Sequence, residues 1–98
     1  GTLRAQLTID KLFALEASDG AWFSPANDVY FMVSGIESGV DFGPVRVHPA
    51  GRDTWELDTG ASANNISLWQ HDLKPGESVN LFVSMFDQDD SFSPVIFV

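Results

Sequence analysis

The chain has no cysteine, and this absence removes both disulfide bonds and thiolate chemistry. With only two histidines besides, few groups are left for nucleophilic catalysis. The sequence also has no phosphate-binding glycine loop, no dinucleotide-binding motif and no Gly-x-Ser-x-Gly motif. We therefore predict that the protein is not an enzyme.

Basic residues are few, and the formal net charge is -9. The five that occur are scattered along the chain: Arg4, Lys11, Arg46, Arg52 and Lys74. Nucleic-acid binding needs clustered lysine and arginine, so we expect no nucleic-acid partner. Direct attraction to an anionic membrane is disfavoured in the same way, unless a cation bridges the two surfaces.

Long apolar runs are absent as well, because no segment approaches the roughly 18 consecutive apolar residues of a membrane-spanning helix. No basic-then-apolar leader opens the chain, and we expect a soluble protein without a transmembrane segment. The length of 98 residues fits a single domain, residues 1–98. Such a domain buries roughly 60–65% of its unfolded surface.

Apolar residues recur with a two-residue period, which is typical of β-strands. The clearest case is Glu77 to Phe86, where Val79, Leu81, Val83 and Met85 would form one apolar face directed inward. The preceding Lys74-Pro75-Gly76-Glu77 predicts a type II turn. Strands are expected at Leu3 to Leu15 with a kink midway, Val29 to Ser34, Pro44 to His48, Asp53 to Leu57, Ile66 to Gln70, Glu77 to Phe86 and Pro94 to Val98.

Segments rich in Gly, Asn, Ser and Pro separate these strands and are the expected loops: Ser18 to Asn27, Gly35 to Gly43 and Asp58 to Asn65. Short strands divided by turn residues indicate an all-β fold. We predict a single antiparallel β-sandwich of about seven or eight strands.

Ten of the fourteen acidic residues are aspartate, and the tightest group is Asp87-Gln88-Asp89-Asp90, directly after the clearest strand. Aspartate holds its carboxylate close to the backbone, so several can converge on one Ca²⁺, which takes six to eight oxygens at about 2.3–2.6 Å. In the simpler alternative, each aspartate hydrogen-bonds its own turn.

Two segments resemble the calcium loops of the C2 domains, the calcium-dependent phospholipid-binding β-sandwiches. Asp28-Val29-Tyr30 stands where that family's first loop enters a strand, and Leu81 to Asp89 is similar to its apolar strand running into an Asp-x-Asp loop. The resemblance implies a C2-like sandwich with both loops at one end. It also implies Ca²⁺ as cofactor, with Asp28, Asp87, Asp89 and Asp19 as ligands, and with Asp90 and Glu16 in reserve.

Trp22 and Phe23 lie in the expected loop beside the acidic residues. They are candidates for partner binding, since large aromatic residues are uncommon in loops unless they pack against the domain or bind a partner. Trp55 and Trp69 lie on strands, where we expect core packing. The sequence thus favours a non-catalytic calcium-binding accessory or targeting module, with a membrane surface, a glycan or a protein as partner. The alternatives are a carbohydrate-binding module that uses Trp22 and a calcium-independent protein-interaction domain.

Overall fold

The computed structural model describes residues 1–15 and 27–88, and these residues form six β-strands and no helix. No segment of this described part is a helix long and apolar enough to cross a membrane. The strands are β1 (Leu3–Phe13), β2 (Asn27–Glu37), β3 (Val40–Val47), β4 (Trp55–Leu57), β5 (Ser62–Leu73) and β6 (Val79–Gln88).

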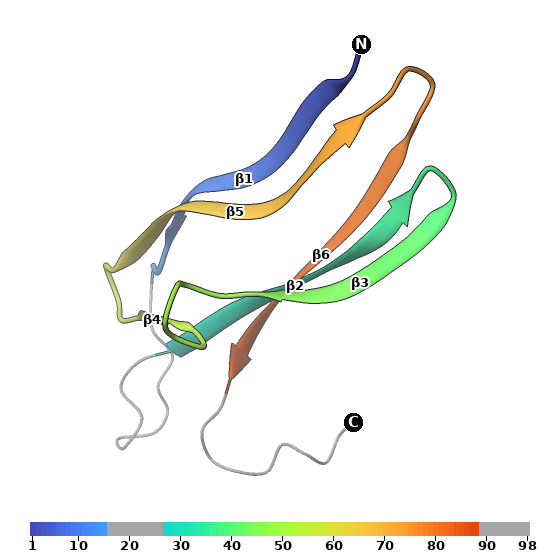
Figure 1. Cartoon of the computed structure of the whole chain (residues 1–98). Coiled ribbons are helices and arrows are strands. Elements are labelled where there is room, and N and C mark those ends of the chain that lie inside the picture. Colours follow the sequence, from blue (N-terminus) through green and yellow to red (C-terminus); the bar gives the residue numbers. More distant parts are fainter. Residues whose placement is uncertain (16–26, 89–98) are drawn as a thin grey trace, which may run out of the picture.

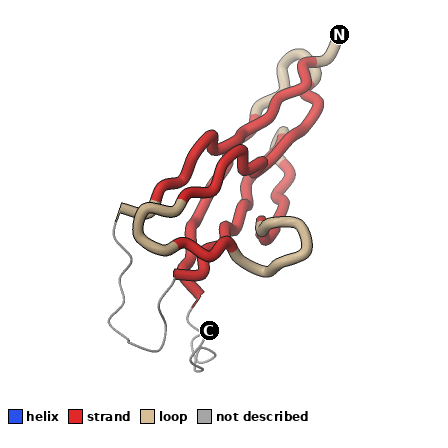
Figure 2. The backbone as a smooth tube through the Cα atoms, turned by 90° about the vertical axis from the view of Figure 1, so that its left-hand side faces the viewer, coloured by secondary structure: helices blue, strands red, loops and turns tan. Residues whose placement is uncertain are grey.

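The six strands form two antiparallel sheets that lie in two layers (Figures 1 and 2). One layer is the β1–β5 pair. In the other, β2 is central, with β6 along one edge and β3 and β4 in succession along the other. The all-β class and the antiparallel sheets agree with the prediction from sequence.

The core lies between the two layers and is built mainly on β2 and β5. Val29, Phe31 and Val33 alternate along β2 and are buried, while Tyr30 and Met32 between them point to the opposite face. The remaining buried apolar residues of the described chain are Leu57, Ala63, Ile66 and Leu68. Burial in β2 thus alternates with the two-residue period of a strand, which is why the alternating apolar pattern in the sequence identified β2 correctly.

The two strand tryptophans pack against this core, as expected. Trp55 meets Phe31 edge-on, with ring centroids 5.8 Å apart. Trp69 on β5 donates a hydrogen bond from Nε1 to Oε2 of Glu37 on β2, at 2.8 Å, which joins the two layers. His71 Nδ1 lies 3.6 Å from the same carboxylate oxygen.

Six of the seven expected strand positions match the structure, although several boundaries were wrong. β1 follows the first expected strand, and its register shifts between Leu7 and Thr8, close to the predicted kink. β2, β3 and β5 are longer than expected, whereas β4 is shorter. The expected strand at Pro94 to Val98 lies outside the described residues.

One expected loop is largely strand, and another is half strand. In Gly35 to Gly43, only Ser38 and Gly39 form the connection, a two-residue hairpin turn in which both have positive φ. In Asp58 to Asn65, β5 begins already at Ser62. Most of Ser18 to Asn27 lies outside the described residues, and Asn27 itself opens β2. The small polar residues in these segments suggested loops. Whether such a segment forms a strand depends on the cross-strand partners that it packs against, and these are distant in sequence.

The apolar face of β6 that was expected to point inward is only partly buried. Val83 pairs with Val33, and Met85 pairs with Phe31, so both side chains are on the core side of the sheet. Leu81 packs against the core, but Val83 and Met85 remain exposed because the described part of the opposite layer holds only β1 and β5.

Gly35 lies where β2 is flanked on both edges, and a Cβ there would overlap the Asn80 carbonyl oxygen of β6 and touch the Phe42 ring of β3. We predict that Gly35→Ala destabilises the domain by about 2–3 kcal/mol or more, because backbone would have to move. Gly39→Ala has open space and should cost only about 1 kcal/mol, from its positive φ. Urea denaturation of both variants tests this, and equal losses would contradict it.

The turn between β5 and β6 agrees with the predicted type II turn. Gly76 has a φ of 85°, and the Glu77 amide donates to the Lys74 carbonyl at 3.1 Å. The Lys74 amide in turn donates to Oε1 of Glu77 at 2.7 Å. This hydrogen bond holds the pKa of Glu77 below its ordinary value; desolvation opposes it, and the Ser38 side chain and nearby positive charge lower the pKa by smaller amounts.

A lowered pKa means that Glu77 stabilises the fold at pH values above the ordinary glutamate pKa, and that this stabilisation is lost as the pH falls through the lowered value. We therefore predict that Glu77→Gln is less stable than the parent chain at neutral pH. The difference should vanish at a pH below both pKa values. Urea denaturation at the two pH values measures it, and a difference that persists in acid would contradict the assignment.

Candidate functional site

Three segments distant in sequence meet at one end of the molecule, where β1 ends, β2 begins and β6 ends (Figure 1). Asp28 pairs with Gln88 across the β2–β6 ladder, and Val29 pairs with Asp87. Ala14, just after β1, lines the same recess as Asn27 and Met85. The turns between β2 and β3 and between β5 and β6 lie at the opposite end.

Asp28 and Asp87 are the two predicted ligands that the described residues contain, and the fold brings them together across 59 positions of sequence. The Asp28 amide donates a hydrogen bond to Oδ1 of Asp87 at 3.2 Å. Asp87 is exposed and Asp28 is half-buried. In the β2–β6 register Asp87 lies opposite Val29 and Asp28 lies opposite Gln88, so the two aspartates are diagonal neighbours at the end of the sheet and their side chains start from opposite faces.

Arg46 is a neighbour that the sequence analysis did not identify. Its Nη2 donates to Oε1 of Gln88 at 3.1 Å and to the Asp53 carbonyl at 2.9 Å. The guanidinium lies 3.6 Å from the centroid of the Tyr30 ring, and Tyr30 also stacks on Phe86 at 5.2 Å. Only the strand register brings these residues together, so no local sequence signal could have revealed them.

The other predicted site residues lie outside the described residues: Asp19, Trp22, Phe23, Asp89 and Asp90, together with the reserve Glu16. Within 1–15 and 27–88, no group of three or more His, Cys, Asp or Glu residues is close enough to hold a metal ion. Asp28 and Asp87 are thus two oxygen donors of the kind Ca²⁺ prefers, and further ligands would have to come from the segments that flank them.

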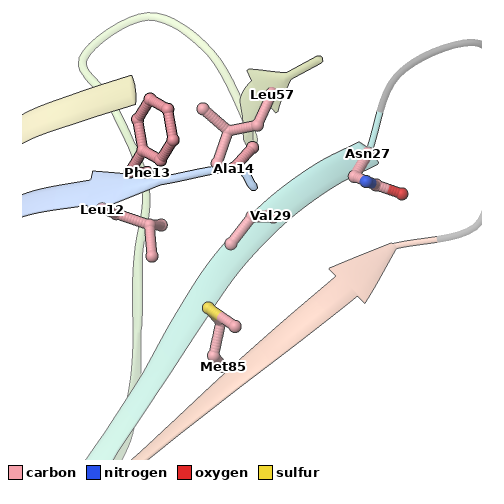
Figure 3. A pocket seen from close by; sticks show the side chains of 7 residues that line it. All are labelled: Leu12, Phe13, Ala14, Asn27, Val29, Leu57 and Met85. Atoms are coloured by element: carbon pink, nitrogen blue, oxygen red, sulfur yellow. The ribbon is translucent and has the colours of Figure 1, made fainter. Parts of the chain in front are cut away.

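Beneath this end lies an apolar recess of about 150 Å³ between the two layers (Figure 3). Its lining is apolar except for Asn27: Leu12, Phe13, Ala14, Asn27, Val29, Leu57 and Met85. The lining contains no titratable side chain, so the recess is suited to an apolar group and not to a metal ion or a charged substrate.

Comparison with known proteins finds no matching family model, no similar curated protein and no similar solved structure at a significant level. The argument for function therefore depends on the geometry of the chain itself.

Proposed function

We propose that this domain is a non-catalytic calcium-binding module whose acidic end, built around Asp28 and Asp87, presents bound Ca²⁺ to an anionic or hydroxylated partner. The observation that carries the proposal is the juxtaposition of these two aspartates at the β2–β6 end. The likeness to C2 domains, including a C2-like sandwich, is part of the same proposal.

The chain path supports a larger ligand set at this end. Residues 16–26, which contain Asp19, connect directly to Asn27 at the start of β2. Residues 89–98, which begin with Asp89 and Asp90, connect directly to Gln88 at the end of β6. Asp89 is two residues from Asp87, at most about 7 Å away along the chain. Every predicted calcium ligand is therefore in this end's strands or in a segment attached to them.

A bound cation would reduce the electrostatic repulsion at the acidic end. Carboxylates that converged on one calcium ion would repel each other in its absence, by roughly 4 kcal/mol for a pair about 4 Å apart at an effective dielectric constant of about 20. The net charge of -9 adds to this repulsion. A bound Ca²⁺ would neutralise the acidic end and supply the positive site that a polyanionic chain otherwise lacks. It would thereby provide the bridging charge that contact with an anionic membrane requires.

Thermal unfolding with excess Ca²⁺, excess Mg²⁺ and chelator tests the binding step. At about one hundred times its dissociation constant, Ca²⁺ should stabilise the fold by about 2.7 kcal/mol, because it binds only the folded state. Asp87→Asn should remove most of this gain. Asp41→Asn, an exposed aspartate at the opposite end, is the matched control with the same change of charge and should keep the gain. Equal melting of the parent chain at saturating Ca²⁺ and in chelator would contradict the proposal.

Co-sedimentation with vesicles tests the targeting step. Vesicles that contain phosphatidylserine should retain the parent chain only when Ca²⁺ is present, and vesicles of phosphatidylcholine alone should not. Asp87→Asn should lose retention, whereas Asp41→Asn should keep it. Retention of the parent chain in chelator would contradict a calcium bridge.

The carbohydrate-binding alternative depends on Trp22, which lies outside the described residues, so the geometry adds nothing to it. Retention on a glycan array that is lost in Trp22→Ala would favour it over the lipid partner. The protein-interaction alternative has an observation of its own in the exposed apolar surface of β6.

A further inference from the structure

A column of stacked planar groups crosses the outer face of the four-stranded sheet, the face turned away from the core. Tyr30 on β2 stacks on Phe86 of β6, with ring centroids 5.2 Å apart and an interplanar angle of 16°. The Arg46 guanidinium from β3 lies 3.6 Å from the centroid of the Tyr30 ring. At these distances the two partners cannot share one face of the ring, and β3 and β6 pair with opposite edges of β2. The column therefore runs in the order Arg46, Tyr30, Phe86.

The guanidinium at one end of this column is held in place by hydrogen bonds. Arg46 Nη2 donates to Oε1 of Gln88 at 3.1 Å and to the Asp53 carbonyl oxygen at 2.9 Å. A planar guanidinium is attracted to the π face of an aromatic ring by electrostatics and by stacking. The fold thus contains one example of a cation stacked on this column.

The other end of the column is open within the described part of the chain. Phe86 is 43% exposed, and no described strand lies beyond β6 on that side of β2. Among the described residues, Tyr30 is the only aromatic residue whose ring stacks on Phe86. A further planar group can therefore stack on the free face of Phe86 as Arg46 stacks on Tyr30.

Phe82 provides a second exposed ring on the same face of the sheet. It precedes Phe86 by four residues on β6, so both side chains point to the same side of the strand. Phe82 is 62% exposed. Four residues of extended chain span about 13 Å, so side chains four residues apart on an extended partner have the same spacing as the two rings.

Charge complementarity decides the chemistry of the partner. The chain has a formal net charge of -9, and Asp87 directly follows Phe86. This charge repels nucleic acid, an anionic membrane and a second copy of the chain, whereas it attracts a basic segment. A basic side chain over an exposed ring benefits from both the negative field of the protein and the π face of the ring.

We propose that Phe82 and Phe86 form a docking surface for an extended basic segment of a partner protein, with two arginines four residues apart stacked on the two rings. The arginine on Phe86 extends the column and gives it a guanidinium at each end. Arginine suits this surface better than lysine, because its guanidinium is planar and more weakly hydrated. The two rings are not calcium ligands, so this binding goes beyond the proposed calcium site.

Nuclear magnetic resonance titration of the full chain with synthetic peptides, in the presence of chelator, tests the proposal. A peptide with two arginines four residues apart should shift the ring signals of Phe82 and Phe86. The same peptide with citrulline for arginine keeps the planar groups without their charge and should bind about ten-fold more weakly. Added salt should weaken binding of the arginine peptide, because screening reduces the attraction. The chelator makes the result independent of the calcium proposal.

Substitution of Phe82 tests the role of the rings. Phe82→Leu keeps an apolar side chain but removes the ring, and it should raise the Kd of the arginine peptide by about two- to five-fold, the loss of one exposed cation–π contact. Phe82→Tyr keeps the ring and should bind as the parent chain does. The matched control is Phe13→Leu, the same change at an exposed ring of β1, which should leave the Kd unchanged. Thermal unfolding shows that each variant is folded.

Equal binding of the arginine and citrulline peptides, or binding that Phe82→Leu does not weaken, would overturn the proposal. Ring signals of Phe82 and Phe86 that do not respond to the arginine peptide at millimolar concentration would also overturn it. The same spectra reveal two other occupants of this surface. Ring signals that change with chain concentration alone would indicate a second copy, and nuclear Overhauser effects from the rings to residues 89–98 would indicate that the chain covers this surface itself. Either result would contradict a basic partner.

Discussion

The pairing of β2 along both of its edges is the constraint on which the rest of the structure depends. β6 accompanies β2 from Asp28 to Glu37, while β3 and β4 share the opposite edge. The face of β2 toward the other layer supplies Val29, Phe31 and Val33, the central apolar residues of the core. Gly35 leaves the space that the neighbouring strands occupy, and Glu37 joins the end of β2 to Trp69 in the other layer.

The calcium proposal follows from the β2–β6 half of this arrangement. The register that opposes Val29 to Asp87 puts the Asp28 amide within hydrogen-bonding distance of the Asp87 carboxylate, and so creates an acidic end. The same ladder leaves the far edge of β6 without a described partner, because β2 satisfies only one side of it. One end of β6 is therefore acidic, whereas its middle is uncharged and exposed.

Local sequence patterns predicted where strands and turns lie better than they predicted how long the strands are. The alternation in β2 and β6 identified both strands, and Pro75-Gly76 identified the turn between β5 and β6, because side-chain period and backbone φ are properties of a few adjacent residues. Gly35 suggested a loop but lies inside a strand, since its role is to admit neighbours from β3 and β6. Val83 and Met85 were expected on a buried face, but both are exposed, because their burial depends on how far β1 and β5 cover β6.

By itself, the sequence determined the all-β class, the positions of most strands, the acidic character of the chain and the aspartates proposed as ligands. These follow from composition and two-residue periodicity, which are local. Only the tertiary structure decided that Asp28 and Asp87 lie together, that Arg46 joins Tyr30 and Gln88, and that no described strand pairs with the second edge of β6. Each of these depends on strand register and sheet order, which result from contacts between residues far apart in the chain and have no signature in any short segment.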